Sequence, residues 1–212
     1  SLLGIIIMSI TGDDLPVQVT HIPGITRVRY TNSTKQDVRL VTAGEDHLVR
    51  LLPSEPTATD VIPLVMEDAT QNISWIEANN KYLVTASEDG AVRLYQHALQ
   101  SEDDPQKATS CIRIVRREVL PVRCVSLERA TESPRAAICS DELIIRVASV
   151  EDPRQITLLT GHTRGVRAAS WSPILPLLVS CGSDGDIRVW DMSSSDGSCV
   201  KVISNQLPAL RP

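Results

Sequence analysis

Four stretches of the sequence repeat one pattern, and this repetition constrains the fold more than any other feature. They read "VTAGEDHLVRLL" at 41–52, "VTASEDGAVRLY" at 84–95, "AICSDELIIRVA" at 137–148 and "VSCGSDGDIRVW" at 179–190. Each has an apolar run, a turn of small and acidic residues, and an alternating run with an Arg two places before its end. Alternation with a period of two predicts strands, and the turn between two strands predicts a hairpin.

A further alternating run precedes each hairpin, at 25–31, 73–78, 122–128 and 166–172. Each copy therefore reads as strand, strand, turn, strand, and a fourth, outermost strand is expected at 199–204 after the last copy. Asp-Gly at 89–90 and 184–185 suits tight turns, because Gly tolerates positive φ and Asp can bond its own backbone. No amphipathic helix pattern is evident, so the sequence predicts an all-β fold of repeated sheets.

The spacing of the copies points to a type of repeat fold. The repeated arginines are 43, 53 and 42 residues apart, in the order Arg50, Arg93, Arg146, Arg188. The first and last spacings resemble the period of roughly 40–45 residues in WD-repeat β-propellers. An acidic, polar insertion at 98–110, expected to be exposed, accounts for the longer middle spacing. The resemblance implies an incomplete propeller, with about four blades present of seven.

The expected boundaries follow from the same alignment. A flexible segment is expected at 1–20, an incomplete propeller at 21–204 and a truncated tail at 205–212. Within the propeller, the blades are expected at 21–53, 69–97, 118–150 and 161–204.

The last copy carries a set of polar residues that resembles the WD-repeat signature. It has Gly-His at 161–162, then Ser180, Asp184 and Trp190. The resemblance implies that His162, Ser180, Asp184 and Trp190 form one hydrogen-bonded chain. A buried indole N–H and a buried imidazole each need a partner, and a satisfied network fixes the register of three strands. Catalysis by the His and Asp is disfavoured, because no nucleophile keeps a fixed spacing to them.

The other copies keep part of this set. The first copy has His21, Thr42 and Asp46, with Leu52 in the place of the Trp. The second copy has Thr85, Asp89 and Tyr95, with Ala69 in the place of the His. The third copy has Glu118, Ile138, Glu142 and Ala148 at the four places, so its network is expected to be lost. Apolar packing and neighbouring blades should hold the third copy instead.

Composition and charge exclude several classes of function. The net charge of −5 gives no overall attraction to nucleic acid, so a contact with DNA would need a local basic patch. The five Cys are widely spaced, without C-x-x-C, which indicates neither a disulfide framework nor a zinc site. No phosphate-binding glycine loop or paired carboxylates recur, so we expect no enzyme, no cofactor and no metal. The apolar start "SLLGIIIM" is too short to span a membrane.

A narrower resemblance rests on the order of several segments. They are "HIPGITRVRYT" at 21–31, "VTASEDGAVRLY" at 84–95, "RREVLPVRCVSL" at 116–127, "SDELIIRVASVEDP" at 140–153 and "LLTGHTRGVRAASWSP" at 159–173. This order resembles the N-terminal WD-repeat domain of replication-fork adaptors, the chromosome-transmission-fidelity or minichromosome-loss proteins of fungi and the acidic nucleoplasmic DNA-binding proteins of animals. The third blade of that family similarly lacks Trp-Asp and carries a Ser-Asp-Glu turn.

This resemblance implies a non-catalytic, nuclear scaffold. Its expected partners are replication-fork proteins, namely DNA polymerase alpha and helicase subunits, with weak, sequence-independent DNA contact and no membrane. The candidate contacts to partners or phosphates are Arg116, Arg117 and Arg164, although solvated arginines on the surface of a net acidic domain are the simpler explanation. The alternative is a generic WD-repeat platform, such as a ubiquitin-ligase substrate receptor or a signalling scaffold.

Overall fold

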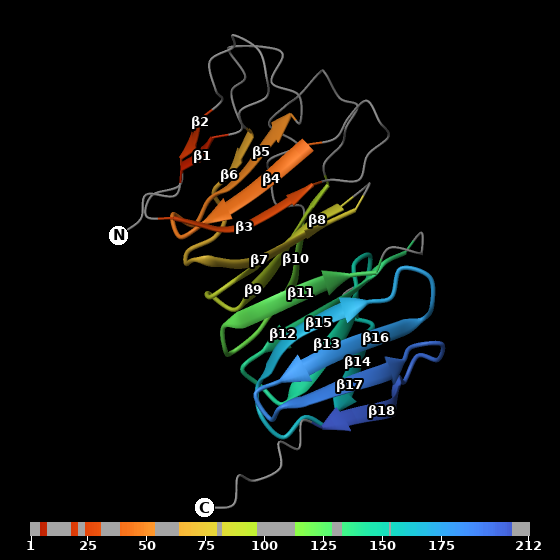
Figure 1. Ribbon diagram of the computed structural model, residues 1–212. Coiled ribbons are helices and arrows are strands. Elements are labelled where there is room, and N and C mark those ends of the chain that lie inside the picture. The colour runs from red at the N-terminus through yellow and green to blue at the C-terminus, as the bar shows by residue number, and fades with distance from the viewer. Residues whose placement is uncertain are drawn as a thin grey trace, which may run out of the picture. The chain divides into compact units, whose positions relative to one another are not determined.

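The structure is a computed structural model in which every described element is a β-strand (Figure 1). It describes residues 5–7, 18–20, 24–30, 39–53, 64–79, 82–96, 113–128, 133–152 and 154–204. The chain divides into two compact units, Ser1–Val122 and Arg123–Pro212. The prediction of an all-β fold built of repeated antiparallel sheets is confirmed.

Two four-stranded sheets make up most of the first unit. The first sheet has the order β3-β4-β5-β6, with bounds Ile25–Tyr30, Arg39–Gly44, Val49–Pro53 and Leu64–Met66. The second has the order β7-β8-β9-β10, with bounds Ile73–Ala78, Tyr82–Ser87, Ala91–Gln96 and Arg113–Arg117. Strand β3 lies beside β7, so the first strands of the two sheets are neighbours.

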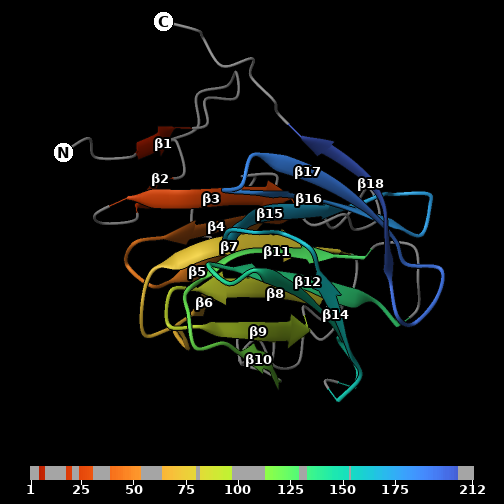
Figure 2. The ribbon, with the colours of Figure 1, turned by 90° about the horizontal axis from the view of Figure 1, so that it is seen from below.

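Two further four-stranded sheets carry the rest of the chain. The third sheet has the order β11-β12-β13-β14, with bounds Val122–Leu127, Arg135–Ser140, Ile144–Ser149 and Ile156–Thr160. The fourth has the order β15-β16-β17-β18, with bounds Val166–Trp171, Leu177–Gly182, Asp186–Asp191 and Ser198–Ser204. Figure 2 shows β15 to β18 in blue, seen from below.

The four central hairpins share one register. In each, the repeated Arg lies opposite the residue at the Ser/Thr place: the pairs are Thr42–Arg50, Thr85–Arg93, Ile138–Arg146 and Ser180–Arg188. The residue two places after that Arg also has a fixed partner, as in Leu83–Tyr95 and Leu178–Trp190. The repeats recognised in the sequence are therefore repeats of strand pairing.

The first strand of a sheet carries a β-bulge near its start in three of the four sheets. The pairing shifts between Ile25 and Arg27 in β3, between residues 73 and 75 in β7, and between residues 166 and 168 in β15. In β3 the bulged residue is Thr26, whose hydroxyl lies 2.7 Å from the carbonyl oxygen of Ile73 in the next sheet. The bulge thus turns a polar group from one sheet toward its neighbour.

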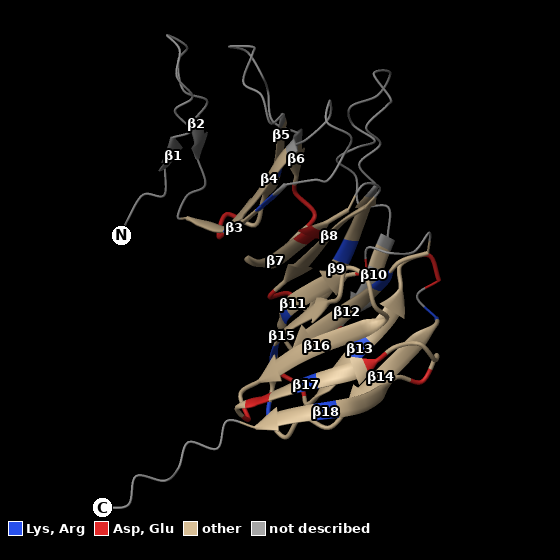
Figure 3. Cartoon of the chain, turned by 45° about the vertical axis from the view of Figure 1, so that its right-hand side comes forward, with Lys and Arg blue, Asp and Glu red and all other residues tan. Residues whose placement is uncertain are grey.

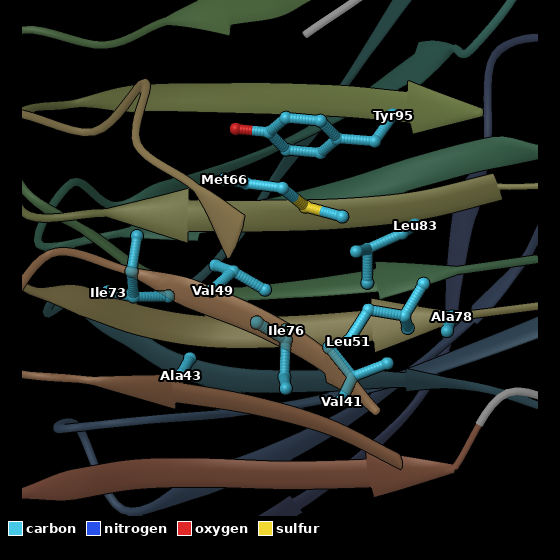
Figure 4. Close-up of a cluster of buried hydrophobic side chains, with 10 residues drawn as sticks. All are labelled: Val41, Ala43, Val49, Leu51, Met66, Ile73, Ile76, Ala78, Leu83 and Tyr95. Atoms are coloured by element: carbon cyan, nitrogen blue, oxygen red, sulfur yellow. The ribbon is translucent and has the colours of Figure 1, made fainter. Parts of the chain in front are cut away.

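Apolar side chains between the first and second sheets form the core of the first unit. Val41, Val49, Leu51 and Met66 come from the first sheet and are at most 2% exposed. They pack against residues of the second sheet, Ile73, Ile76, Leu83 and Tyr95 among them (Figure 4). Tyr95, expected at the place of the Trp, therefore contributes its ring to the contact between two sheets.

The structure adds fourth strands that the sequence pattern did not identify. Each of the first three sheets ends in an outer strand, β6, β10 or β14, whereas only the outer strand of the last copy was expected. Arg116 and Arg117, two of the candidate contact residues, belong to the outer strand β10 of the second sheet.

The N-terminal segment contains regular structure that the sequence did not predict. Within the segment expected to be flexible, strands β1 (Ile5–Ile7) and β2 (Gln18–Thr20) pair in an antiparallel hairpin. The acidic insertion at 98–110 and the tail at 205–212 lie outside the described residues.

Candidate functional site

The fourth sheet brings its four signature residues into one chain of hydrogen bonds. The Trp190 indole Nε1–H donates to Ser180 Oγ at 2.9 Å, and Ser180 Oγ lies 2.8 Å from His162 Nε2. His162 Nδ1 lies 2.8 Å from Asp184 Oδ2. The His162 and Asp184 side chains are only 1% and 3% exposed. The chain joins β16, β17 and the loop before β15, so it fixes how three segments lie together.

One proton in this chain has a fixed place. Asp184 is held as a carboxylate and can only accept, so the proton between it and His162 lies on Nδ1 of the imidazole. His162 is bonded at both ring nitrogens, through Nδ1 to Asp184 and through Nε2 to Ser180.

Asp184 is the anchor of the turn as well as the end of the network. Its Oδ2 also accepts from the backbone N–H of Thr163 at 2.9 Å, and its Oδ1 accepts from the N–H of Asp186 at 3.1 Å. Burial alone would raise the pKa of this carboxyl, but the donors from Thr163, His162 and Asp186 outweigh it and lower the pKa to about 2. The side chain is thus held as a carboxylate by three donors.

Two glycines make room for the network. A Cβ on Gly161 would lie 2.7 Å from the guanidinium Nη1 of Arg188 and 3.4 Å from the Trp190 ring. A Cβ on Gly182 would lie 2.6 Å from Asp184 Oδ1 and 2.7 Å from His162 Nδ1. A larger residue at 182 would displace a member of the network, and one at 161 would displace the Arg188 guanidinium.

In the second sheet an arginine, Arg93, is the partner of the turn acid, Asp89. Arg93 contacts Asp89 through two nitrogens at 3.1 and 2.6 Å, and both side chains are under 10% exposed. Thr70 donates to Asp89 Oδ2 through its N–H at 3.1 Å and its hydroxyl at 3.0 Å. Burial would raise the pKa of Asp89, but these donors and the Ala91 N–H hold it well below its usual range.

The remaining expected members of the second sheet do not join a chain like that of the fourth. Thr85 is fully buried, and its hydroxyl has no hydrogen-bond partner among the described residues. Ala69, at the place of the His, packs against the apolar core of the first unit. Arg93, which the sequence showed only as a repeat marker, is therefore the residue that replaces the His as partner of the turn acid.

The first and third sheets also pair the turn acid with the repeated Arg. Arg50 contacts Asp46 at 2.7 Å, and Arg146 contacts Glu142 at 2.7 Å, each four residues after its acid. Thr42 and Leu52 are buried in the first sheet, and His21 lies outside the described residues. The third sheet lacks the His and Trp, as expected, but it keeps a turn contact that the sequence did not predict.

The partner of the repeated Arg changes only in the fourth sheet. There Asp184 is occupied by His162, and Arg188 turns instead to Asp186 at 3.1 Å. The signal for this exchange is in the sequence: an acid stands four residues before every repeated Arg, and the last copy has a further acid, Asp186, between that acid and the Arg.

The structure describes the side chain of only one of the three candidate contact residues. Arg164 is exposed in the loop before β15, whereas the side chains of Arg116 and Arg117 lie outside the described ones. In the second unit, Arg123 and Arg167 both contact Asp141, at 2.7 and 2.9 Å. The hydrogen bond from Arg123 is the main cause that lowers the pKa of Asp141. Arg123 and Arg167 are thus paired with one acid, whereas Arg164 is exposed.

The described residues contain neither a cluster of metal ligands nor a membrane-spanning helix. No group of three or more His, Cys, Asp or Glu there could hold a metal ion. The same part of the chain contains no helix with the length and apolar character needed to cross a membrane.

Comparison with known proteins agrees with the repeat pattern. Residues 153–191 match the WD40 family, described as WD domain, G-beta repeat. Human Striatin-4 is 32% identical over 129 residues, which cover 56% of this chain and 17% of the relative. Nuclear distribution protein nudF 1 of Talaromyces marneffei is 40% identical over 68 residues, covering 32% of this chain and 14% of the relative.

A third relative is matched over more of the chain. WD repeat and HMG-box DNA-binding protein 1 of Xenopus laevis is 28% identical over 164 residues, 77% of this chain and 13% of the relative. The chain thus spans less than a fifth of the length of each of these three relatives. The four antiparallel sheets in one register form blades of a WD-repeat β-propeller fold, and residues 153–191 match one WD40 repeat.

Proposed function

We propose that this chain is a non-catalytic scaffold from the N-terminal propeller of an adaptor for DNA replication and sister-chromatid cohesion. In this role it acts in the nucleus, on chromatin, where it helps to link DNA polymerase alpha to the replicative helicase. Its broader character as a WD-repeat platform for protein interaction rests on the WD40 match and on the sheets. Such platforms bind through loops held on a rigid framework.

One observation carries the replication role. The similarity to WD repeat and HMG-box DNA-binding protein 1 extends over 77% of this chain, although it is lower in identity than the shorter matches. It is the kind of relative that the sequence resemblance implied, and that resemblance rests on the copy without Trp and with a Ser-Asp-Glu turn at 140–142. A generic WD-repeat platform has no functional need to combine a missing Trp with a Ser-Asp-Glu turn in one copy.

The site geometry supports a scaffold because the polar groups of the site hydrogen-bond to one another. In the fourth sheet His162 is bonded at both nitrogens, and Asp184 accepts from three donors. A general base or nucleophile must also be open to a substrate, whereas His162 and Ser180 are 4% and 1% exposed and Ser180 Oγ accepts from the Trp190 indole. The network therefore holds strands in place and leaves recognition to the exposed loops.

Chromatin-fraction proteomics of the tagged parent protein in synchronised cells tests the role. We expect nuclear enrichment during DNA synthesis, with polymerase alpha and helicase subunits co-purifying. A matched sample from cells outside S phase is the control. A cytoplasmic protein, or one that brings down cullin-ligase subunits, would contradict the replication role.

Any DNA contact should be weak and independent of sequence, because the net charge is −5 and only local arginines can meet phosphates. The affinity for duplex DNA should fall steeply with salt. Replacing Arg116, Arg117 and Arg164 together with Ala should reduce the slope of that fall. Arg154→Ala, an exposed arginine outside this set, is the control and should leave the slope unchanged. An equal change in the control would refute the assignment of these three residues.

A second candidate is a generic WD-repeat platform, such as a ubiquitin-ligase substrate receptor or a signalling scaffold. The observation that favours it is the higher identity to proteins with other names, 32% to Striatin-4 and 40% to nudF 1. The proteomic experiment separates the two candidates, because their partners differ.

A further inference from the structure

Three arginines lie at one end of the second unit, where strands β11 and β15 begin. Arg123 is the second residue of β11, Arg167 is the second residue of β15, and Arg164 stands in the loop before β15. Figure 3 marks basic residues in blue near the starts of both strands. The side chains of Arg123 and Arg167 are 34% and 55% exposed, and Arg164 is exposed as well. These three residues are named the arginine rim below.

One acid, Asp141 in the turn between β12 and β13, orients two guanidinium groups of the rim. Arg123 donates to Asp141 Oδ2 through Nε at 3.0 Å and through Nη2 at 2.7 Å. Arg167 donates to Asp141 Oδ1 through Nη1 at 2.9 Å, and its Nε donates to Ser183 Oγ at 2.6 Å. Both guanidinium groups therefore have a fixed direction, although the carboxylate balances only one of their two charges.

The backbone that carries Arg164 is fixed on both sides of this residue. The N–H of Thr163 donates to Asp184 Oδ2 at 2.9 Å. Gly165 lies against the turn of Asp141, since a Cβ on Gly165 would be 2.9 Å from the Asp141 carbonyl oxygen. In the described part of the chain, the Arg164 side chain makes no hydrogen bond and no ion pair. An unpaired guanidinium on an anchored backbone loses little freedom when it binds an anion.

The other acids in the turns of the second unit do not offset the rim. Glu142 is paired with Arg146 at 2.7 Å, and Asp186 is paired with Arg188 at 3.1 Å. Asp184 is 3% exposed and lies inside the hydrogen-bonded network of the fourth sheet. Three arginines against the one remaining carboxylate leave the rim with a net charge of +2.

The first unit has short hydroxyl side chains at the places of the two paired arginines. The second residues of β3 and β7 are Thr26 and Ser74, whose hydroxyls donate to the carbonyls of Ile73 and Val122 at 2.7 and 2.5 Å. A hydroxyl at this place thus suffices to bond the neighbouring backbone. The arginines of the rim supply a positive charge that this contact does not need.

We infer that the arginine rim binds the phosphate group of a phosphorylated peptide from a partner protein. Such a phosphate carries a charge of about −2 and three acceptor oxygens, which suit guanidinium groups that donate in pairs. Duplex DNA fits less well, because its affinity comes from many phosphate contacts along the helix, whereas the rim is compact and the net charge of the chain is −5. The inference concerns this surface of the platform and does not depend on the replication role.

A pair of peptide libraries tests the inference. Each peptide of the first library carries one phosphoserine at a fixed place, with varied residues on both sides, and the second library carries Ser at that place. The tagged parent protein is immobilised at physiological salt, and the peptides that it retains are quantified by mass spectrometry. Short duplex DNA is then added as a competitor.

We expect the parent to retain the phosphorylated library about tenfold or more above the Ser library, because bonds between guanidinium and phosphate are charge-assisted. Arg164→Ala should reduce this retention about tenfold, and Arg164→Lys should reduce it less, since an ammonium keeps the charge without the planar pair of donors. Arg154→Ala, at an exposed arginine of another loop, is the matched control and should retain the library like the parent. The melting temperature of Arg164→Ala should equal that of the parent, which separates lost binding from lost folding.

Three results would overturn the inference. One is equal retention of the two libraries by the parent. Another is a retention that Arg164→Ala leaves unchanged or that Arg154→Ala reduces equally. The third is displacement of the phosphorylated library by duplex DNA at the same concentration of phosphate groups, which would assign the rim to nucleic acid. A parent protein that is absent from chromatin but retains the library through Arg164 would refute the replication role and support the inference.

Discussion

Replacing Asp184 with Ala removes one acceptor from three donors at once. The Nδ1–H of His162 and the backbone N–H groups of Thr163 and Asp186 would all lose their partner. The two backbone donors lie near the surface and can turn to water, whereas the His162 side chain is 1% exposed and cannot. One buried unpaired donor costs about 1–3 kcal/mol, so we expect the free energy of unfolding to fall by that amount.

Urea unfolding followed by intrinsic fluorescence measures this change, because Trp171 and Trp190 both lie in the second unit. A double-mutant cycle with His162→Ala should give a coupling energy of about 1 kcal/mol, since both changes break the same bond. Asp186→Ala is the control on the same turn, because its pair with Arg188 is partly exposed and should contribute less. If Asp184→Ala unfolds like the parent, or if the cycle shows no coupling, the network does not hold the sheet.

The same carboxylate predicts a dependence on pH. The pKa of Asp184 is about 2 in the folded chain against an ordinary value of 3.8, so its contribution is fully present above 3.8 and is lost as the pH falls toward 2. The lowering corresponds to about 2 kcal/mol, which solvent screening at a turn reduces to about 1 kcal/mol. The stability difference between the parent and Asp184→Ala should therefore shrink on acidification across this range. A difference that stays constant would contradict the ionised form.

Three further changes test the packing around the turns, each by thermal or urea unfolding. Trp190→Ala removes a ring that is 2% exposed and should cost about 3–5 kcal/mol; a loss below that of Asp184→Ala would contradict its role in packing. Gly182→Ala should cost about 1–3 kcal/mol by crowding the network, whereas Gly24→Ala, with nothing within 4 Å, should not; equal effects would refute the steric argument. Asp89→Ala removes the carboxylate that pairs with the buried Arg93 and should cost about 3–5 kcal/mol, and a neutral result would show that the pair is dispensable.

The hairpins and the network of the fourth sheet could be predicted because their signals are local and strong. An apolar run, a Gly-rich acidic turn and an alternating run specify a hairpin and its register together. The place of Trp190 also had an unambiguous alignment, since the repeated Arg stands two residues before it in every copy.

The outer strands were missed for a physical reason. An outer strand pairs along one edge only, so its sequence need not alternate. Strand β10 reads "RIVRR" and β6 has three residues, and neither gives a clear period. The turn ion pairs were missed because the repeat pattern shows where Arg93 and its equivalents stand but not the direction of their side chains. Only the register, which places the Arg beside the turn, shows that they contact the acid.

The choice of partner for the turn acid has a consequence for the order of assembly. In the first three sheets the acid and its Arg are four residues apart, within a single hairpin. In the fourth sheet Asp184 bonds instead to His162, which lies 22 residues earlier in the chain. Closing that longer loop costs about 1.5 kcal/mol more in chain entropy. Three hairpins can thus set their own register without the rest of the chain. The turn of the fourth gains its bond to His162 only when the loop before β15, which is synthesised earlier, docks against it.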